Sequence, residues 1–543
     1  MSEAKPETVS RCFAQTAARH PARAFLNVLA ETAGIYGIEA GEISYGAMAE
    51  RAEARRLEFA RQGYGPGHRV GLLVENRPDF FVFWLALNGL GISVVPINPD
   101  LRARELCYLI GHSEQVLTIA IASRVADIEE AGVQARARLK VMTPDAAVPP
   151  ALTPAGREPV TSDTEAALLY TSGTTGMPKG CVLTNTYFLT CAHWYETVGG
   201  HCALGPDGER MLTPLPLFHM NAMACSAMGM IRVGGCLTVL DRFHPRTWWE
   251  SVRASKASVV HYLGVMPSML MGAAPHGSDR AHAVRFGFGA GVDRSLHAPF
   301  EARFGFPLIE AWAMTETGNG AVVAASRDPR HVGTNCFGKP APEVECRIEL
   351  DNGEAAGDGE PGELLVRRAG DTPRHGFFDR YLKDEASTAE AWRGGWFHTG
   401  DIVRRNPDGT LVFVDRKKNV IRRSGENIAA VEVEGALKRH DLVRDAAVCA
   451  TPDPVRGDEV FACIVAERDL AAEEREEAAR ALVHWCLKQL AYYKAPGYVA
   501  FLSALPLTAT NKVQRGEMKT LVARLIAEGD FVDTRALKRR TGG

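Results

Sequence analysis

The chain has 543 residues, 46% of them hydrophobic, with 62 Lys and Arg against 65 Asp and Glu, which gives a net charge of −3. This near balance provides no basic field for DNA or RNA, so the sequence argues against a nucleic-acid partner. The length exceeds what one hydrophobic core usually supports, and we therefore expect two or more domains.

The N-terminus and the cysteines predict a cytoplasmic protein. The N-terminus has no apolar signal segment, and no stretch reaches the roughly 18 apolar residues of a membrane span. The 12 cysteines form neither Cys-x-x-Cys pairs nor Cys/His clusters of zinc spacing, which predicts reduced thiols. Cys225 lies in a Met-rich run and could border a ligand, although a buried packing role is the stronger interpretation.

Alternating strands and helices are predicted along the first part of the chain. The predicted elements are a strand at 69–74, a helix at 78–88, a strand at 92–96 and a helix at 102–111, then a strand at 236–240, a helix at 248–254, a strand at 259–263 and a helix at 267–271. Such alternation is typical of parallel sheets with helices on both faces. The Pro- and Ala-rich stretch 131–163 is predicted to be a surface connection between two such α/β units.

The pattern changes from Gly338 onward. Turn signals at 351–353, 357–362 and 407–409 predict hairpins of a small β-rich subdomain. The following elements are predicted to be a helix at 430–439, strands at 446–450 and 461–466, a helix at 473–490 and a strand at 498–501. They are sufficient for a separate α+β module of about 125 residues.

The stretch from Tyr170 to Gly180 combines three glycines, four Ser or Thr hydroxyls and one lysine, and it follows a strand predicted at 165–170. Glycines let backbone amides approach an anion closely, and the hydroxyls and the lysine add donors and charge. The spacing Gly-x-x-Gly-x-x-Lys-Gly lacks the register of a Walker P-loop. The stretch therefore predicts a phosphate-binding loop of another kind.

This loop resembles the signature of the adenylate-forming superfamily, which includes acyl-CoA ligases, firefly-type luciferases and the adenylation domains of peptide synthetases. The resemblance implies an α/β fold: a large N-terminal domain of two α/β sheet subdomains with a small β-rich subdomain, and a small mobile α+β C-terminal domain. The implied bounds are 1–415 and 419–543, joined by a hinge at 416–418. The loop residues implied to bind nucleotide are Thr171, Ser172, Gly173, Thr174, Thr175 and Lys179.

Three further blocks resemble nucleotide-binding segments of the family: a Gly-rich turn at 286–291, a Thr-Glu element at 310–318 and an aspartate block at 396–401. Trp312 stands where the family usually has Tyr, and its flat face can still stack on adenine. Glu316 would bind Mg²⁺, which favours a carboxylate together with phosphate oxygens. The nucleotide-binding residues implied by these blocks are Ala290, Gly291, Glu310, Ala311, Trp312, Thr315 and Asp401, of which Thr315 would donate to the α-phosphate and Asp401 would accept the ribose hydroxyls.

The segment 214–219 resembles the loop whose histidine lies beside the acyl group and the entering thiol. The implied acyl pocket consists of His219, Met220, Asn221, Leu263, Gly289, Ala313 and Gly318. Most of these residues are small or apolar, so we expect a short or medium acid, branched and cyclic acids included. Ala313 replaces the usual Gly, and its methyl group would trim the pocket.

The last blocks belong to the predicted mobile domain. The stretch 415–418 resembles the hinge, in which Arg416 would reach ribose or phosphate and Lys418 would absorb the backbone rotation. Ser424, Gly425 and Glu426 resemble the segment that lines the CoA tunnel. Lys512 corresponds to the lysine that neutralises the charge between the carboxylate and the α-phosphate. The implied catalytic residues are Lys512, Thr315, Glu316 and His219.

The resemblance covers nearly the whole chain and predicts an enzyme, an ATP-dependent, AMP-forming acid–CoA ligase using Mg²⁺. It is closest to bacterial ligases of the crotonobetaine/carnitine-CoA type through the stretch from Phe413 to Asn427. Crotonobetaine/carnitine-CoA ligase, aryl-CoA ligase, a luciferase-like oxidase and transfer to a carrier protein stay open as alternatives. An alternative of another class is a non-catalytic nucleotide-binding protein. The predicted partners are the small acid, ATP and CoA, with a homodimer as an open option.

Overall fold

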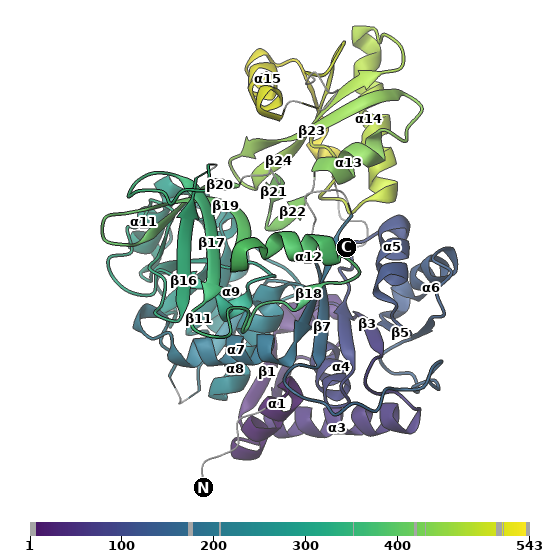
Figure 1. The fold of residues 1–543 in the computed structure, drawn as a ribbon, viewed down its shortest axis with the longest axis vertical. Helices are drawn as coiled ribbons and strands as arrows, with labels where there is room; N and C mark the ends of the chain where they lie inside the picture. Colours follow the sequence, from purple (N-terminus) through teal and green to yellow (C-terminus); the bar gives the residue numbers. More distant parts are fainter. Residues whose placement is uncertain are drawn as a thin grey trace. The chain divides into compact units, whose positions relative to one another are not determined.

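The structure is a computed structural model that describes residues 7–171, 177–205, 208–350, 352–416, 421–428, 430–506, 513 and 515–538. The chain divides into two compact units (Figure 1). Unit 1 comprises residues 1–99, 110–169 and 180–415, and unit 2 comprises residues 100–109, 170–179 and 416–543. The predicted hinge residue Lys418 lies outside the described residues, so the predicted domain bounds stay a prediction.

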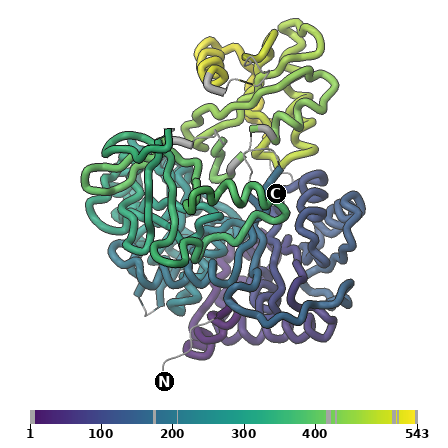
Figure 2. Tube along the Cα trace, in the orientation of Figure 1, coloured from purple at the N-terminus to yellow at the C-terminus, as the bar shows by residue number. Residues whose placement is uncertain are grey.

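Apart from the ends of the three strands β7, β8 and β20, three sheets lie in unit 1, and Figure 2 traces the chain through them from purple to green. The eight-stranded sheet has the order β14 (Val323–Ala324), β13 (Leu308–Trp312), β12 (Phe286–Ala290), β11 (Val259–Leu263), β9 (Arg210–Thr213), β10 (Cys236–Val239), β1 (Ala24–Val28) and β2 (Gly41–Ser44). The seven-stranded sheet has the order β18 (Arg380–Tyr381), β8 (Lys179–Thr184), β7 (Glu165–Thr171), β4 (Ser93–Pro96), β3 (Arg69–Leu73), β5 (Leu117–Ala120) and β6 (Lys140–Met142). The five-stranded sheet has the order β15 (Cys336–Gly338), β20 (Leu411–Arg416), β19 (Phe397–Arg405), β17 (Gly362–Arg368) and β16 (Val344–Glu349).

The helices before residue 400 are α1 (Val9–Arg19), α2 (Ala30–Tyr36), α3 (Tyr45–Arg61), α4 (Pro78–Asn88), α5 (Ala103–Ser113), α6 (Val125–Gln134), α7 (Asn185–Thr197), α8 (Ala227–Val233), α9 (Trp248–Ser255), α10 (Val265–Met271), α11 (Arg294–Phe304) and α12 (Glu385–Ala391). Local chemistry sets several of their starts. Pro78 stands in the first turn of α4, and the Asp293 carboxylate accepts the Ser295 N–H at 2.8 Å to cap α11. The α4 side chains from Phe80 to Asn88 are all buried, which explains a helix without a polar face.

In unit 2, the six-stranded sheet has the order β22 (Glu426–Ile428), β21 (Ile421–Arg423), β24 (Gly457–Ala466), β25 (Tyr498–Phe501) and β26 (Val532–Asp533), and β23 (Val443–Asp453) also pairs with β24. Its helices are α13 (Ala430–Leu437), α14 (Ala472–Gln489) and α15 (Arg515–Glu528). Buried aliphatic side chains form clusters that contain only residues of this unit. The unit therefore has an apolar core of its own.

The predicted fold class is confirmed, with parallel pairing through β10, β9, β11, β12 and β13 and an antiparallel five-stranded sheet. The stretch 131–163 was predicted to be a surface connection. This prediction is wrong for its first part, where α6 continues to Gln134 and β6 pairs with β5 as an edge strand, whereas no helix or strand lies between Met142 and Glu165, a stretch that the structure describes throughout. Among the described residues, no helix combines the length and the apolar character needed to cross a membrane.

Candidate active site

Three of the predicted blocks and Leu263 meet at one edge of the eight-stranded sheet. Strands β9, β11, β12 and β13 run parallel, with Leu263 paired to Ala290 and Gly289 paired to Glu310. Their carboxyl ends therefore carry the acyl-loop segment, Leu263, the Gly-rich turn and Trp312. The carboxyl edge of a parallel sheet is where ligands bind in open α/β folds. The segments that follow these four strands thus form one candidate site within unit 1.

Trp312 and Asp401, far apart in sequence, are joined at this edge. The indole Nε1–H of Trp312 donates to Asp401 Oδ2 at 2.9 Å, and both side chains are buried. Asp401 lies on β19, where its backbone N–H donates to Thr399 Oγ1 at 3.0 Å. The contact brings the residue predicted to stack on adenine next to the residue predicted to hold ribose. A Tyr at position 312, usual in the family, has no indole N–H to make it.

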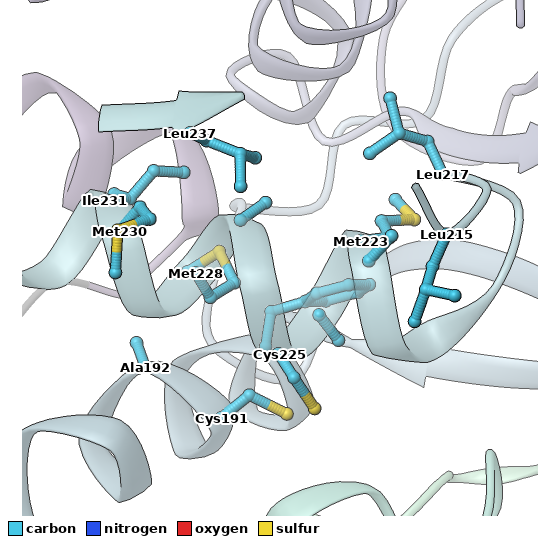
Figure 3. Packing of buried hydrophobic residues seen from close by; sticks show 14 of the residues in the cluster. Cys191, Ala192, Leu215, Leu217, Met223, Cys225, Met228, Met230, Ile231 and Leu237 are labelled. Atoms are coloured by element: carbon cyan, nitrogen blue, oxygen red, sulfur yellow. The ribbon is translucent and has the colours of Figure 1, made fainter. Parts of the chain in front are cut away.

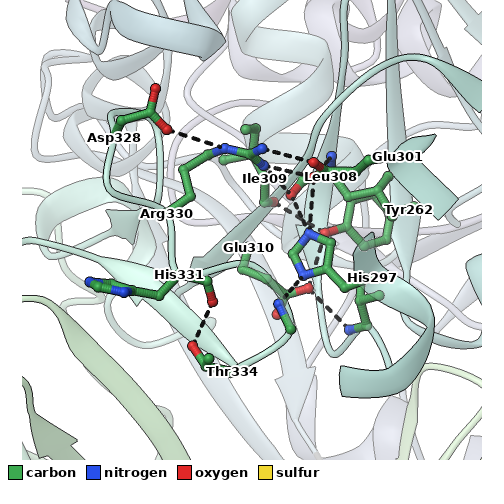
Figure 4. A network of polar contacts seen from close by, with 12 residues as sticks. Tyr262, His297, Glu301, Leu308, Ile309, Glu310, Asp328, Arg330, His331 and Thr334 are labelled. Atoms are coloured by element: carbon green, nitrogen blue, oxygen red, sulfur yellow. Dashed lines mark hydrogen bonds and ion pairs between the residues drawn. The ribbon is translucent and has the colours of Figure 1, made fainter. Parts of the chain in front are cut away.

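Glu310 organises the Gly-rich turn from inside the protein. Its carboxylate accepts the N–H of Gly291 at 2.9 Å and the N–H of Val292 at 3.0 Å, and the Tyr262 hydroxyl donates to it at 3.1 Å (Figure 4). Burial raises the pKa of this carboxyl, and the two backbone N–H groups oppose the rise. Glu310 was predicted to bind nucleotide; the structure shows it engaged with the backbone of the turn.

A second carboxylate, Glu301, ties α11 to the sheet (Figure 4). Glu301 accepts from the Arg330 guanidinium at 2.7 and 2.8 Å and lies 3.1 Å from His297 Nε2. Burial acts to raise the pKa of Glu301, but the hydrogen bonds of Arg330 and His297 outweigh it and lower that pKa to about 2. The Leu308 N–H of β13 also donates to Glu301 Oε1 at 2.9 Å, so this network fixes the strand that carries Glu310 and Trp312.

Two small residues predicted for the acyl pocket, Gly289 and Gly318, are required by packing against protein. A Cβ on Gly289 would lie 2.2 Å from the Tyr262 carbonyl oxygen, and one on Gly318 would lie 2.4 Å from the Tyr187 ring. Gly318 also has φ of 48°, a conformation that glycine adopts without strain. Ala313 is exposed. The close approach at Gly289 and Gly318 therefore shapes the wall of the site through the backbone.

Glu316 is held by a tyrosine from the seven-stranded sheet. The Tyr381 hydroxyl donates to Glu316 Oε1 at 2.9 Å, and both residues are buried. Burial and the charge of Glu316 raise the pKa of Tyr381, so its hydroxyl stays protonated and keeps donating. A carboxylate oriented in this way fits Mg²⁺, which usually takes one or two protein carboxylates together with phosphate oxygens. In the described part of the chain, no group of three or more His, Cys, Asp or Glu side chains is placed to hold a metal.

The predicted acyl loop is anchored by Asn76, which the sequence did not single out. The Asn76 amide donates to the carbonyls of Leu215 at 3.2 Å and Leu240 at 2.7 Å, and its Oδ1 accepts the Leu217 N–H at 2.9 Å. His219 follows this loop and is half-buried, like Met220 and Asn221. A single buried side chain, Asn76, thus holds the loop against the sheet.

His261 forms a buried polar network behind Asn221 and was also missed. Its Nδ1 lies 2.6 Å from Asn221 Oδ1 and 2.9 Å from Ser226 Oγ, and its Nε2 lies 2.5 Å from the Tyr195 hydroxyl. The ring is fully buried, which lowers its pKa to about 3 and keeps it neutral. Because Asn221 Oδ1 can only accept, Nδ1 carries the proton and Nε2 accepts from Tyr195. No motif marks such a histidine.

We expect His261→Phe to lower the free energy of unfolding by about 3 kcal/mol, because the buried Tyr195 and Ser226 hydroxyls and the half-buried Asn221 amide each lose a hydrogen bond. Urea unfolding of the variant and the wild type measures the difference. His193→Phe is the matched control, since His193 is 65% exposed and we expect a change within about 0.5 kcal/mol. Equal stability of His261→Phe and the wild type would contradict a structural role for the network.

Sulfur-containing side chains pack around the turn that begins at Asn221. The π-helical turn Asn221–Ser226 continues into α8, and Met223, Cys225 and Met228 pack with Cys191 of α7 (Figure 3). Cys225 is 3% exposed, and its thiol donates to Asn319 Oδ1 at 3.3 Å. The packing interpretation of Cys225 is confirmed. A π-turn is uncommon and often lies at functional sites.

The remaining predicted residues are only partly described. Thr171 ends β7 and Lys179 begins β8, whereas Ser172, Gly173, Thr174 and Thr175 lie outside the described residues, as do Lys418 and Lys512. Thr315 is half-buried next to Glu316, Ala311 lies in β13, and Arg416 ends β20. In unit 2, Ser424 and Gly425 form the turn between β21 and β22, and Glu426 begins β22. These assignments stay predictions.

The sequence matches the model of the AMP-binding enzyme family over residues 13–373 and that of the AMP-binding enzyme C-terminal domain over residues 432–512. The chain belongs to the AMP-binding enzyme family. It is 34% identical over 486 residues to the sulfoacetate–CoA ligase of Cupriavidus necator, covering 87% of this chain and 91% of that protein. It is 29% identical over 516 residues to the crotonobetaine/carnitine–CoA ligase of Salmonella arizonae, covering 90% and 96%.

The fold agrees with that of a solved relative. The o-succinylbenzoate CoA synthetase of Bacillus subtilis superposes with a TM-score of 0.79 at 23% identity, covering 94% of this chain and 98% of that one. The same enzyme has been solved with ATP and a magnesium ion. The prediction of an enzyme of the adenylate-forming superfamily, an ATP-dependent and AMP-forming acid–CoA ligase, is therefore confirmed at the level of reaction class.

Proposed function

We propose that this AMP-binding enzyme joins a small carboxylic acid to coenzyme A in two steps. A carboxylate oxygen attacks the α-phosphorus of ATP, and pyrophosphate leaves. The CoA thiolate then attacks the acyl carbon, the acyl–oxygen bond breaks, and AMP leaves. The observation that carries the proposal is the Trp312–Asp401 hydrogen bond at the carboxyl edge of the eight-stranded sheet. It joins an aromatic face for adenine to a carboxylate for ribose at the place where parallel strands end.

The side chains have separate tasks in this proposal. Asp401 accepts the ribose hydroxyls while Trp312 keeps its carboxylate oriented. Glu316, oriented by Tyr381, would hold Mg²⁺, which when bound neutralises phosphate charge. Thr315 donates to the α-phosphate, and Lys512 stabilises the charge that develops during adenylate formation. His219 borders the acyl group.

The substrate is proposed to be a short or medium acid. The predicted pocket residues include two half-buried polar side chains, His219 and Asn221, and none that is charged. At Gly289 the Tyr262 backbone packs closely against the glycine, and at Gly318 the Tyr187 ring does so. This close packing favours a compact pocket. Relatives that act on sulfoacetate and on crotonobetaine or carnitine make small charged acids the second candidate class.

All 12 cysteines are thiols and not disulfides, which supports a cytoplasmic enzyme.

A homodimer is part of the proposal only as an alternative to the monomer. Light scattering of the purified protein distinguishes the two states.

The test is ATP-dependent pyrophosphate and AMP release over a panel of acids, each with and without CoA. The panel contains acetate, branched, alicyclic and aromatic acids, malonate, sulfoacetate, carnitine and crotonobetaine. We expect turnover with at least one acid to require CoA and to give AMP and an acyl thioester in equal amounts. Turnover without CoA, or only with a carrier protein bearing a phosphopantetheine thiol, would overturn CoA as the acceptor. No pyrophosphate from any acid, together with no binding of ATP, would overturn the ligase assignment.

A further inference from the structure

The hairpin of β21 and β22 presents the residues predicted to line the path of the CoA thiol. Its two turn residues, Ser424 and Gly425, have φ of 51° and 87°, as in a type I′ turn. The Ser424 N–H donates to the Arg456 carbonyl at 2.8 Å, and the Arg422 N–H donates to Asp458 Oδ2 at 2.9 Å. The hairpin is therefore attached to the start of β24.

A buried charged triad fixes the base of this hairpin. Arg423 Nε donates to Glu459 Oε2 at 2.8 Å, and Lys538 Nζ donates to Glu459 Oε1 at 2.5 Å. The three side chains are buried. Arg423 comes from the hairpin, Glu459 from β24, and Lys538 from the C-terminal segment. One carboxylate thus connects two parts of unit 2 that are 115 residues apart in sequence.

The surroundings of Lys538 in the triad disfavour its charged form. Burial and the nearby charge of Arg423 lower the pKa of Lys538 to about 7, against the attraction of Glu459. Burial acts to raise the pKa of Glu459, but the charges of Lys538 and Arg423 outweigh it and lower that pKa. Glu459 is therefore ionised and held by Arg423, and by Lys538 in its protonated form. If one of these positively charged partners is removed, part of the negative charge of the buried carboxylate is left unpaired, which destabilises the folded state.

Strand pairing and a hydroxyl contact hold the segment that carries Lys538 in place. In β26, Val532 and Asp533 pair with β25, and the Thr534 hydroxyl donates to the Pro496 carbonyl at 2.9 Å. Gly497 leaves room for the triad, because a Cβ there would lie 2.5 Å from Glu459 Cδ. The end of the described chain is therefore folded back onto the sheet with its lysine pointing inward.

We propose that Lys538 is a positioning residue for thioester formation: through Glu459 and Arg423 it fixes the hairpin 421–428 where the CoA thiol arrives. This inference rests on the proposed function, which gives the hairpin its role. Lys538 does not act in adenylate formation, so its loss separates the two half-reactions. Misplacement of a binding segment by a fraction of an ångström lowers the rate of the step that uses it.

The experiment compares Lys538→Met with Lys488→Met, whose parent lysine is exposed on α14. The acid is the best substrate found in the panel. Adenylate formation is measured as pyrophosphate release with hydroxylamine as the acceptor, and thioester formation is measured from preformed acyl-AMP with CoA. We expect Lys538→Met to keep adenylate formation within about twofold and to lose about tenfold or more in kcat/KM for CoA. Lys488→Met should match the wild type in both.

Hydrogen exchange gives a readout that needs no substrate. We expect faster exchange of the Arg422 and Ser424 amides in Lys538→Met and no change in Lys488→Met. If Lys538→Met does not fold, Lys538→Gln, which keeps a donor, replaces it in both measurements. Equal loss of both half-reactions, no loss of either, or unchanged exchange at the hairpin would overturn the positioning role. A wild type that forms no thioester would instead overturn the proposed function, while the exchange result would still show whether Lys538 fixes the hairpin.

Discussion

Lys512→Ala is expected to lower the rate of acyl-adenylate formation by about 10²–10³-fold. The lysine supplies the positive charge that the transition state needs between the carboxylate and the α-phosphate, and electrostatic groups of this kind contribute that much to catalysis. Pyrophosphate release with the best acid of the panel measures the effect. Thioester formation from preformed acyl-AMP should be retained, because the α-phosphate bond has already formed in that substrate.

The matched control is Lys488→Ala, which removes an exposed lysine of unit 2 and should leave both rates unchanged. Full adenylation activity of Lys512→Ala would contradict the assignment. A loss of both half-reactions would point to a general effect on the C-terminal region.

Asp401→Asn is expected to raise the KM for ATP about 100-fold. The substitution removes the charge that accepts the ribose hydroxyls and turns one acceptor into a donor facing the Trp312 N–H, 2.9 Å away in the wild type. Hydrogen bonds to a charged group contribute about 1.5–3 kcal/mol, and about 3 kcal/mol corresponds to 100-fold in affinity. Steady-state kinetics with varied ATP, supported by calorimetric ATP binding, measures the change.

Trp312→Phe separates the two contributions at this position. It keeps an aromatic face for adenine and removes only the indole N–H, so we expect a smaller rise of less than about tenfold in the KM for ATP. A rise as large as that of Asp401→Asn would show that the Trp312 N–H, and not the carboxylate, dominates. An unchanged KM for ATP in Asp401→Asn would contradict the placement of ribose at Asp401.

Much of the scaffold could be predicted because its signals are local. The apolar runs at 69–74 and 259–263 are strands of parallel sheets, and Pro78 does begin α4. The turn at 407–409 joins β19 to β20, where Gly409 has φ of 84°. The stretch around β6 was misjudged because three residues at a sheet edge carry too little periodicity to be recognised.

The polar contacts of the site could not be predicted, because each depends on partners far away in sequence. Asn76 holds a loop 139 residues later, and Trp312 meets Asp401 across 89 residues. His261 looks like any strand histidine until Tyr195 and Asn221 are placed around it. Such pairings arise from the fold and leave no spacing that a sequence pattern could detect.

In the proposed reaction, the carboxylate of the acid attacks the α-phosphorus of ATP. The most direct measurement uses the best acid of the panel with both carboxylate oxygens labelled as ¹⁸O, together with ATP and CoA, and analyses the nucleotide and the thioester by mass spectrometry. We expect one ¹⁸O in each AMP formed and one in each thioester carbonyl. AMP without label, or label in pyrophosphate or ADP, would contradict the claim.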